Sequence, residues 1–234
     1  TAVTLLPTVI ADNCDASPIL SYLDNVGSSS CDGHQIITRS WTLTDDCGNS
    51  TTGDQTITIL DTISPTFTTP ADTVIYFDAV CFADTTVTGT GDVIDEADGC
   101  SIGLQASYSD AFVQGCTNEF VITRTWTLAD DCSNTTIKVQ TITIRDTLDP
   151  TFTVPTDTIV YLDGSCATAA FPAQPGSPSG VSDNCTTAGF IETYTDNLIG
   201  TPRSIERTWR IADACGNYSE QVQMITILDT IAPI

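Results

Sequence analysis

One sequence pattern dominates this chain because it occurs three times. Its first copy reads Ile-Thr-Arg-Ser-Trp-Thr-Leu-Thr-Asp-Asp-Cys-Gly-Asn. The copies occupy residues 37–49, 122–134 and 205–217. Their tryptophans, Trp41, Trp126 and Trp209, are spaced about 84 residues apart, which is typical of consecutive small domains and too long for a solenoid. The sequence therefore predicts a tandem array of related domains.

The domain boundaries repeat as well, because Asp-Thr-x-x-Pro closes each repeat. It begins at Asp61 and Asp146, and Asp229 opens the corresponding sequence near the end of the chain. We therefore expect an N-terminally truncated first repeat, a second, a third and the start of another, at residues 1–62, 63–147, 148–230 and 231–234. The chain would then be an excerpt from a longer array.

Each copy of the pattern predicts a β-strand that runs into a turn. In the first copy Arg39, Trp41 and Leu43 alternate with polar residues, so they share one face of a strand. We place Trp41 and Leu43 in the core, with the Arg39 guanidinium reaching a carboxylate at the end of the sheet. Further short alternating strands separated by turn residues predict an all-β fold. We expect tandem immunoglobulin-like β-sandwich domains of about 84 residues each.

The charge balance excludes several classes of partner. The chain has 30 acidic and 7 Lys or Arg residues among 234, a net charge of −23. Such a chain repels nucleic acid and anionic membranes. No stretch is long and apolar enough to span a membrane. The expected partners are neighbouring repeats, other copies in a homo-oligomeric filament, or cell-surface glycans.

The ten cysteines indicate disulfides. They recur at fixed repeat positions, none forms a Cys-x-x-Cys pair, and His34 is the only histidine, so a zinc site is disfavoured. Disulfides in turn predict an oxidising, extracellular location. Small domains bury a modest share of their surface, and disulfides are the expected supplement.

The pairing of these cysteines cannot be chosen by counting, because each of three connectivities leaves two cysteines over. We favour the pairing in which the two polar turns of one repeat meet at the same end of a sandwich. This gives Cys14–Cys47, Cys100–Cys132 and Cys185–Cys215, with Cys81–Cys116 added. Cys31 would bond to a residue outside the sequence. Cys166 would be left unpaired, as a buried thiol or as a cross-link to another chain.

Acidic residues recur at the joints between repeats. Asp61, Asp146 and Asp229 precede a proline by four residues, and further aspartates lie in the neighbouring turns. These clusters could supply oxygen ligands to calcium, which would be the only cofactor. The alternative is turn chemistry, since aspartate side chains cap turns. We expect the prolines, together with packing of Phe67 and Phe152 against the preceding domain, to stiffen the joints.

The Arg-Thr-Trp strand, the Asp-Asn-Cys turn and the Asp-Thr-x-x-Pro joint resemble the HYR-like immunoglobulin-type repeats of large secreted Bacteroidota surface proteins. Those proteins include gliding-motility adhesins and cell-surface filaments exported by type IX secretion. The resemblance covers essentially the whole chain. It implies an extracellular cell-surface protein with an adhesive or structural role.

Threonines after aspartate add a further candidate site. The Asp-Thr pairs followed by an aliphatic residue or threonine resemble the O-glycosylation signal of Bacteroidota. The acceptors would be Thr62, Thr73, Thr85, Thr147, Thr158 and Thr230. The alternative is a threonine at a strand edge after a turn aspartate.

No catalytic pattern appears in the sequence: there is no Gly-x-Ser-x-Gly, no His-Glu-x-x-His and no phosphate-cradling glycine loop. We expect no enzyme activity and a structural role, as the shaft of a disulfide-stabilised surface fibre or giant adhesin. Two alternatives remain open: a glycan- or protein-binding module, and spacer repeats attached to a secreted hydrolase. A binding module should carry exposed aromatic residues in one repeat only.

Overall fold

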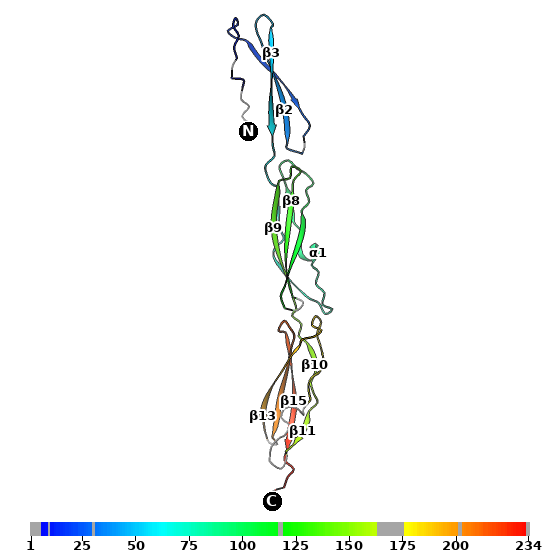
Figure 1. Ribbon diagram of the computed structural model, residues 1–234. Helices are drawn as coiled ribbons and strands as arrows, with labels where there is room; N and C mark the ends of the chain where they lie inside the picture. Colours follow the sequence, from blue (N-terminus) through cyan, green and yellow to red (C-terminus); the bar gives the residue numbers. More distant parts are fainter. Residues whose placement is uncertain are drawn as a thin grey trace. The chain divides into compact units, whose positions relative to one another are not determined.

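The computed structural model describes six ranges of the chain: residues 6–8, 10–29, 31–116, 119–162, 176–200 and 203–232 (Figure 1). The structure is almost entirely β. Its strands are β1 (Ile19–Val26), β2 (Gln35–Thr44), β3 (Ser50–Ile59), β4 (Thr66–Thr68), β5 (Thr73–Tyr76), β6 (Ile94–Ala97), β7 (Ser107–Gln114), β8 (Phe120–Ala129), β9 (Thr135–Arg145), β10 (Thr151–Thr153), β11 (Thr158–Tyr161), β12 (Ser179–Ser182), β13 (Ile191–Ile199), β14 (Ser204–Ala212) and β15 (Tyr218–Leu228). The expected all-β class is confirmed.

The helix α1 (Val87–Thr90) is a single turn. In the described part of the chain, no helix has the length and the apolar character needed to cross a membrane.

The sheets repeat along the chain as the sequence does. A four-stranded sheet, β5-β9-β8-β7, occurs with a two-stranded sheet, β4-β6, and the same arrangement returns as β11-β15-β14-β13 with β10-β12. The short strands β5 and β11 pair in parallel with β9 and β15, whereas the long strand β14 pairs antiparallel with β13 and β15. The first repeat has the sheet β1-β2-β3. This is the expected β-sandwich pattern.

Contacts divide the chain into two compact units. The first consists of Thr1–Pro70, Asp92–Ser109 and Thr125–Gln140, and the second of Ala71–Gly91, Asp110–Arg124 and Thr141–Ile234. The division falls inside the second repeat. One part of the second repeat therefore belongs to the unit of the first repeat, and the other part belongs to the unit of the third repeat.

The core of every repeat is built around its tryptophan. Trp126 and Trp209 are 1% and 3% exposed, and Trp41 is 9% exposed. Each ring packs on a tyrosine of the neighbouring strand, with ring centroids 5.1–5.2 Å apart. Trp41 and Trp209 donate their ring N–H to a glutamine side chain of the third strand. Tilted aromatic pairs of this kind add to the burial that stabilises the sheet.

The arginine of the repeated pattern lies on the same face as the tryptophan. Arg39 and Arg207 are bonded to Asp24 and Asp196, which lie directly opposite them on the adjacent strand. Each guanidinium also lies over a tyrosine ring, 4.2 Å and 4.0 Å from the ring centroid. The expected carboxylate partner exists, but its expected place at the sheet end was wrong, because the neighbouring strand supplies it across the ladder.

In the second copy of this pair, the arginine donates hydrogen bonds to further partners besides the aspartate. Arg124 is 1% exposed and bonds to Asp110 through Nε at 2.8 Å and Nη2 at 2.8 Å. It also donates to Thr90 Oγ1 and to the Thr85 carbonyl, each at 2.7 Å. A buried guanidinium needs such partners, because an unpaired buried charge is strongly destabilising.

Candidate functional site

Three disulfides join cysteines that belong to consecutive sequence repeats. Cys31 bonds to Cys132, Cys81 to Cys185 and Cys116 to Cys215, with Cα–Cα distances of 5.2, 5.0 and 5.3 Å. The bonded residues are 101, 104 and 99 positions apart. The first disulfide lies in the first unit, and the other two lie in the second. Disulfides of this kind persist in an oxidising, extracellular compartment.

The pairing predicted within each repeat is wrong. Cys81, Cys116, Cys132, Cys185 and Cys215 are bonded, but to other partners than expected. Cys14, Cys47 and Cys100 are free, and Cys31, expected to bond outside the sequence, is bonded within it. The reason is that the cysteines of the polar turns meet cysteines of the preceding repeat instead of each other: both turns of the third repeat do so, and in the second repeat the turn of Cys132 does. Cys166 lies outside the described residues.

The rule of pairing is the same at both joints where it can be compared. A cysteine in the loop between the first two long strands of one repeat bonds to the cysteine in the Asp-x-Cys turn of the next. Cys31 follows β1 and bonds to Cys132, between β8 and β9; Cys116 follows β7 and bonds to Cys215, between β14 and β15. A second type of bond joins Cys81, after β5, to Cys185, after β12.

Aspartate side chains fix the turns that present these cysteines. Asp130 and Asp213 accept hydrogen bonds from the backbone N–H of Cys132 and Cys215, at 2.9 Å and 2.8 Å. Each also accepts from the N–H and side-chain amide of the asparagine four residues later. An aspartate that bonds the backbone two residues on is a local turn device. The predicted turn chemistry of these residues is therefore present.

We call the connection between the second and third repeats joint two, and that between the first and second repeats joint one. The linker of joint two, residues 146–152, accepts hydrogen bonds from the third repeat at its backbone carbonyl groups. Asn217 donates its side-chain amide to the Asp146 carbonyl at 3.2 Å, and Gln221 donates to the Phe152 carbonyl at 2.7 Å. Ser219 donates to Pro150 between them. Donors at alternate positions thus fix the linker in an extended form along one strand.

Joint one contains the linker at residues 61–67 and repeats this arrangement. Asn134 donates to the Asp61 carbonyl at 3.3 Å, Thr136 donates to Pro65, and Lys138 donates to Phe67. The same three strand positions are used at both joints, with different side chains.

The phenylalanine at the end of each linker was expected to pack against the preceding domain. In joint two this was wrong, because Phe152 packs with Trp209 and Ile211 in the core of the repeat that follows the linker. Phe67 is 3% exposed in joint one, and Lys138 lies 4.9 Å from the centroid of its ring. The phenylalanine therefore anchors the linker to the domain that it enters.

Three carboxylates converge in joint two. Asp146, Asp183 and Asp213 each offer an oxygen, and these oxygens lie within 4.8 Å of one another. Asp146 and Asp213 are 3% and 1% exposed. The pKa of Asp146 lies above its ordinary value, first because burial removes water and then because of the negative charges of Asp183 and Asp213.

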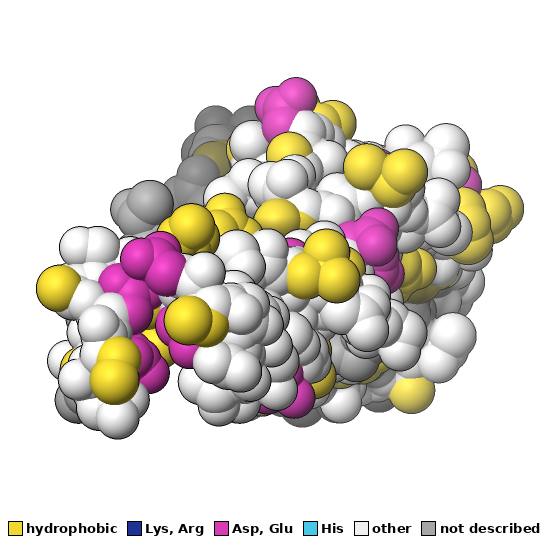
Figure 2. Space-filling model, turned by 90° about the horizontal axis from the view of Figure 1, so that it is seen from above, with side chains coloured by type: hydrophobic (Ala, Val, Ile, Leu, Met, Phe, Trp, Pro, Cys, Tyr) yellow, Lys and Arg dark blue, Asp and Glu magenta, His cyan; other side chains and the backbone are white. Residues whose placement is uncertain are grey.

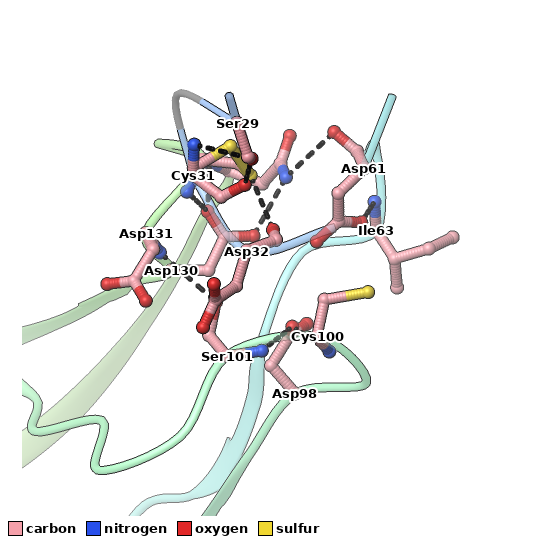
Figure 3. The surroundings of a disulfide bond; sticks show 12 residues. Ser29, Cys31, Asp32, Asp61, Ile63, Asp98, Cys100, Ser101, Asp130 and Asp131 are labelled. Carbon is pink, nitrogen blue, oxygen red and sulfur yellow. Dashed lines mark hydrogen bonds between the residues drawn. A yellow bond between two sulfur atoms is a disulfide. The ribbon is translucent and has the colours of Figure 1, made fainter. Parts of the chain in front are cut away.

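Joint one places a thiol in the corresponding group. Asp61, Asp98 and Cys100 lie within the same 4.8 Å limit, beside the Cys31–Cys132 disulfide (Figure 3). The pKa of the Cys100 thiol is raised, because its neighbours remove part of its hydration and because Asp61 and Asp98 are negatively charged. This exposed thiol is therefore a poor nucleophile, because the thiolate is the attacking form.

The three expected metal ligands therefore differ in their surroundings. Asp61 lies close to Asp98, and Asp146 lies close to Asp183 and Asp213. In the sequence these partners are recognisable only as aspartates of a recurring turn. Asp229 is exposed and accepts one hydrogen bond, from the Ile231 N–H at 3.0 Å. No carboxylate group forms around Asp229 among the described residues. The additional residues share one signal, an Asp-x-Cys or Asp-Asn-Cys turn in each repeat.

The first repeat presents the same two turns without a partner repeat among the described residues. Cys14 and Cys47 line a cavity of about 340 Å³ together with Asp12, Asp15 and Asp45. These positions correspond to Cys100 and Cys132 in the second repeat. The turns are joined through Asp15, which accepts a hydrogen bond from the Asp46 N–H at 3.1 Å.

The candidate glycosylation sites fall into two groups. The threonines of the joints are exposed: Thr62, Thr147 and Thr230. The other three are half-buried. Thr73 and Thr158 lie in the strands β5 and β11, and the carbonyl of Thr85 accepts a hydrogen bond from Arg124. Only the joint threonines are freely accessible for modification.

The surface follows the charge balance of the sequence. The face shown in Figure 2 carries acidic and hydrophobic side chains, with no Lys or Arg in view.

One cavity of about 220 Å³ breaks the repeat symmetry, because it is lined by three phenylalanines of the second repeat: Phe77, Phe112 and Phe120. Phe112 is 66% exposed, and its counterpart in the third repeat is Leu198.

No protein-family model and no curated protein matches the chain. Similar solved structures include extracellular cadherin domains 3–6 of protocadherin gammaB7, in a cis-dimer structure, with 13% identity and a TM-score of 0.32, covering 91% of this chain and 67% of that one. Human mucin-like protocadherin, domains EC1-2, matches with 9% identity and a TM-score of 0.28, covering 70% and 99%.

A SusE-like surface-located polysaccharide-binding protein from Bacteroides thetaiotaomicron is also similar. It has 8% identity and a TM-score of 0.19, and the alignment covers 89% of this chain and 54% of that one. Similarity at these levels carries no assignment of function, so the arguments that follow depend on this chain's own residues.

Proposed function

We propose that this chain is the structural shaft of a secreted, disulfide-stabilised cell-surface fibre or giant adhesin, without enzyme activity. The observation that carries the proposal is the bonding of each described disulfide from one sequence repeat to the next. A protein that needed only stable single domains would gain as much from disulfides inside each repeat. Bonds between repeats instead secure the connection itself, which carries the same tension as the domains because the two are in series.

The order of the bonds determines how far the chain extends under tension. The shortest covalent route from Cys31 to Cys215 crosses to Cys132, returns to Cys116 and crosses again. That route contains about 16 residues and spans about 55 Å when extended, whereas the intact backbone of roughly 180 residues spans about 630 Å. The third bond, from Cys81 to Cys185, lies off this route and strengthens joint two.

Single-molecule pulling on the chain, tethered at both termini, tests the proposal. With disulfides intact, the segment between Cys31 and Cys215 should add about 55 Å of contour, and a reducing agent should raise this to about 630 Å. A variant with Cys31→Ser and Cys132→Ser is the matched control, because it should release the first part of the segment only. Equal contour lengths before and after reduction would refute the proposed role.

The two polar turns of the first repeat, which contain Cys14 and Cys47, indicate what the first repeat binds. Cys14 and Cys47 occupy the positions that Cys100 or Cys185 and Cys132 or Cys215 have in the other repeats. We propose that they bond to another repeat with cysteines placed as in Cys81 and Cys116, from the same chain or from another copy in a filament. The residue boundaries 1–62, 63–147, 148–230 and 231–234 are part of this proposal. So is membership of the HYR-like Bacteroidota surface repeats exported by type IX secretion, supported by the shared motifs.

A second candidate function is an adhesive module that binds a protein or a glycan. It is favoured by the phenylalanine-lined cavity of the second repeat, because the position of Phe112 is taken by Leu198 in the third. If the cavity binds, Phe112→Ser should abolish attachment of the chain to a cell surface, and Leu198→Ser, at the equivalent position of the third repeat, should leave it unchanged. Equal attachment by both variants would exclude the cavity.

A further inference from the structure

The carboxylates of joint two have the spacing of cation ligands. Calcium binds oxygens at 2.3–2.6 Å, so two oxygens on one ion lie at most about 4.6–5.2 Å apart. The oxygens of Asp146, Asp183 and Asp213 lie within 4.8 Å of one another. Without a positive charge among them, three carboxylates at this distance repel one another strongly, because water screens buried groups weakly.

The hydrogen bonds of this group leave oxygens without donors. Asp146 uses Oδ1 to accept from the Leu148 N–H at 3.2 Å, and Asp183 uses Oδ1 to accept from the Thr186 N–H at 3.0 Å. Oδ2 of Asp146, Oδ2 of Asp183 and Oδ1 of Asn184 are buried and have no hydrogen-bond partner. The backbone thus orients Asp146 and Asp183 through one oxygen and leaves the other inside, whereas Asp213 also accepts at Oδ2, from the Asn217 side-chain amide. A buried polar atom without a partner is costly, and a charged one more so.

We propose that Asp146, Asp183 and Asp213 bind a calcium ion, with the side-chain oxygen of Asn184 as a fourth ligand and water or backbone carbonyls completing the shell. Every ligand is an oxygen, which favours calcium over the softer transition metals. Magnesium keeps most of its water and normally takes one or two carboxylates, so a set of three carboxylates and an amide fits calcium better. This inference is independent of the proposed role as a shaft.

The same arrangement recurs in joint one, in the other unit. Oδ2 of Asp61 and Oδ2 of Asp98 are likewise buried without a partner, and Figure 3 shows both residues with Asp130 and Cys100. The Cys100 thiol lies within the group and contributes no hard oxygen. We therefore expect a second calcium ion to bind here more weakly than in joint two.

Calcium titration of the oxidised 234-residue chain tests the site. By isothermal titration calorimetry, calcium chloride should bind at about two sites, magnesium chloride should bind more weakly, and calcium should raise the melting temperature. Asp146→Asn should lose the tighter site and the larger part of that rise. Asp229→Asn is the matched control, because it changes the same motif position where no carboxylate group forms, and it should behave as the parent.

Three results would overturn the proposal. The first is the absence of saturable calcium binding by the parent chain at millimolar concentrations, which needs no variant. The second is an unchanged number of bound ions in Asp146→Asn. The third is a higher melting temperature of Asp146→Asn in the presence of a chelator, with calcium leaving the parent unchanged, since this indicates that the buried carboxyl holds a proton in place of an ion.

Discussion

Cys116 and Cys215 bring their Cα atoms to 5.3 Å although 99 residues separate them in the chain. We predict that non-reducing peptide mapping finds this bond together with Cys31–Cys132 and Cys81–Cys185. The physical reason is that each bonded pair consists of a loop and a turn from consecutive repeats. Blocking free thiols before digestion prevents exchange and serves as the control. A peptide that joins Cys100 to Cys132, or Cys185 to Cys215, would contradict the pairing.

The buried ion pair of the second repeat should matter more than its counterpart in the first. Asp110→Asn leaves the Arg124 guanidinium, 1% exposed, without its carboxylate, and we expect a loss of about 3–5 kcal/mol of unfolding free energy. Asp24→Asn is the matched control, because the Arg39 and Asp24 side chains are 15% and 31% exposed, and solvent screens such a pair, so the loss should be much smaller. Urea unfolding of both variants measures the difference. Equal losses would mean that burial does not decide the strength of the pair.

The alternating pattern of the strands predicted which side chains face the core, but it did not predict the contacts between consecutive repeats. Alternation placed Trp41 on the inward face, and the structure places Trp41, Trp126 and Trp209 there. The pairing of Asp110 with Arg124 was missed, since alternation within one strand does not reveal the register against its neighbour. The connectivity of the cysteines depends on how one repeat follows another. That arrangement is set by the linker contacts of residues such as Asn134 and Asn217, to which no periodicity points.

The three tryptophans should differ in their contribution to stability. Trp126 is 1% exposed, so Trp126→Ala leaves a void and should cost about 3–5 kcal/mol. Trp41 is 9% exposed and lines a cavity of about 510 Å³ with Leu6 and Leu20, so its neighbours have room to relax and Trp41→Ala should cost less. Circular dichroism during urea unfolding measures both without depending on tryptophan fluorescence. A larger loss in Trp41→Ala would show that the first sheet is better packed than its exposure indicates.

Acid should weaken the turns before it affects the strands. The pKa of Asp45 lies below its ordinary value of about 3.9, first because the Asn49 side chain donates a hydrogen bond to the carboxylate and then because backbone N–H groups of Asn49 and Cys47 do. A lowered folded-state pKa means that the folded protein binds the proton less readily than the unfolded chain. The stabilisation is therefore fully present above about pH 4 and is lost as the pH falls through the folded-state pKa. Melting temperatures between about pH 2 and pH 6 measure this loss.

The variant Asp45→Asn separates this turn from the other acidic groups. The amide keeps an acceptor for the Cys47 N–H, which Asp45 Oδ1 accepts at 2.9 Å, but carries no charge to lose. We therefore expect the variant to melt below the parent at pH 6 and to approach it at pH 2. Asp54→Asn, on the exposed strand β3, is the control for the removal of one negative charge outside this turn. A constant difference between parent and Asp45→Asn across the range would show that the Asp45 charge does not stabilise the turn.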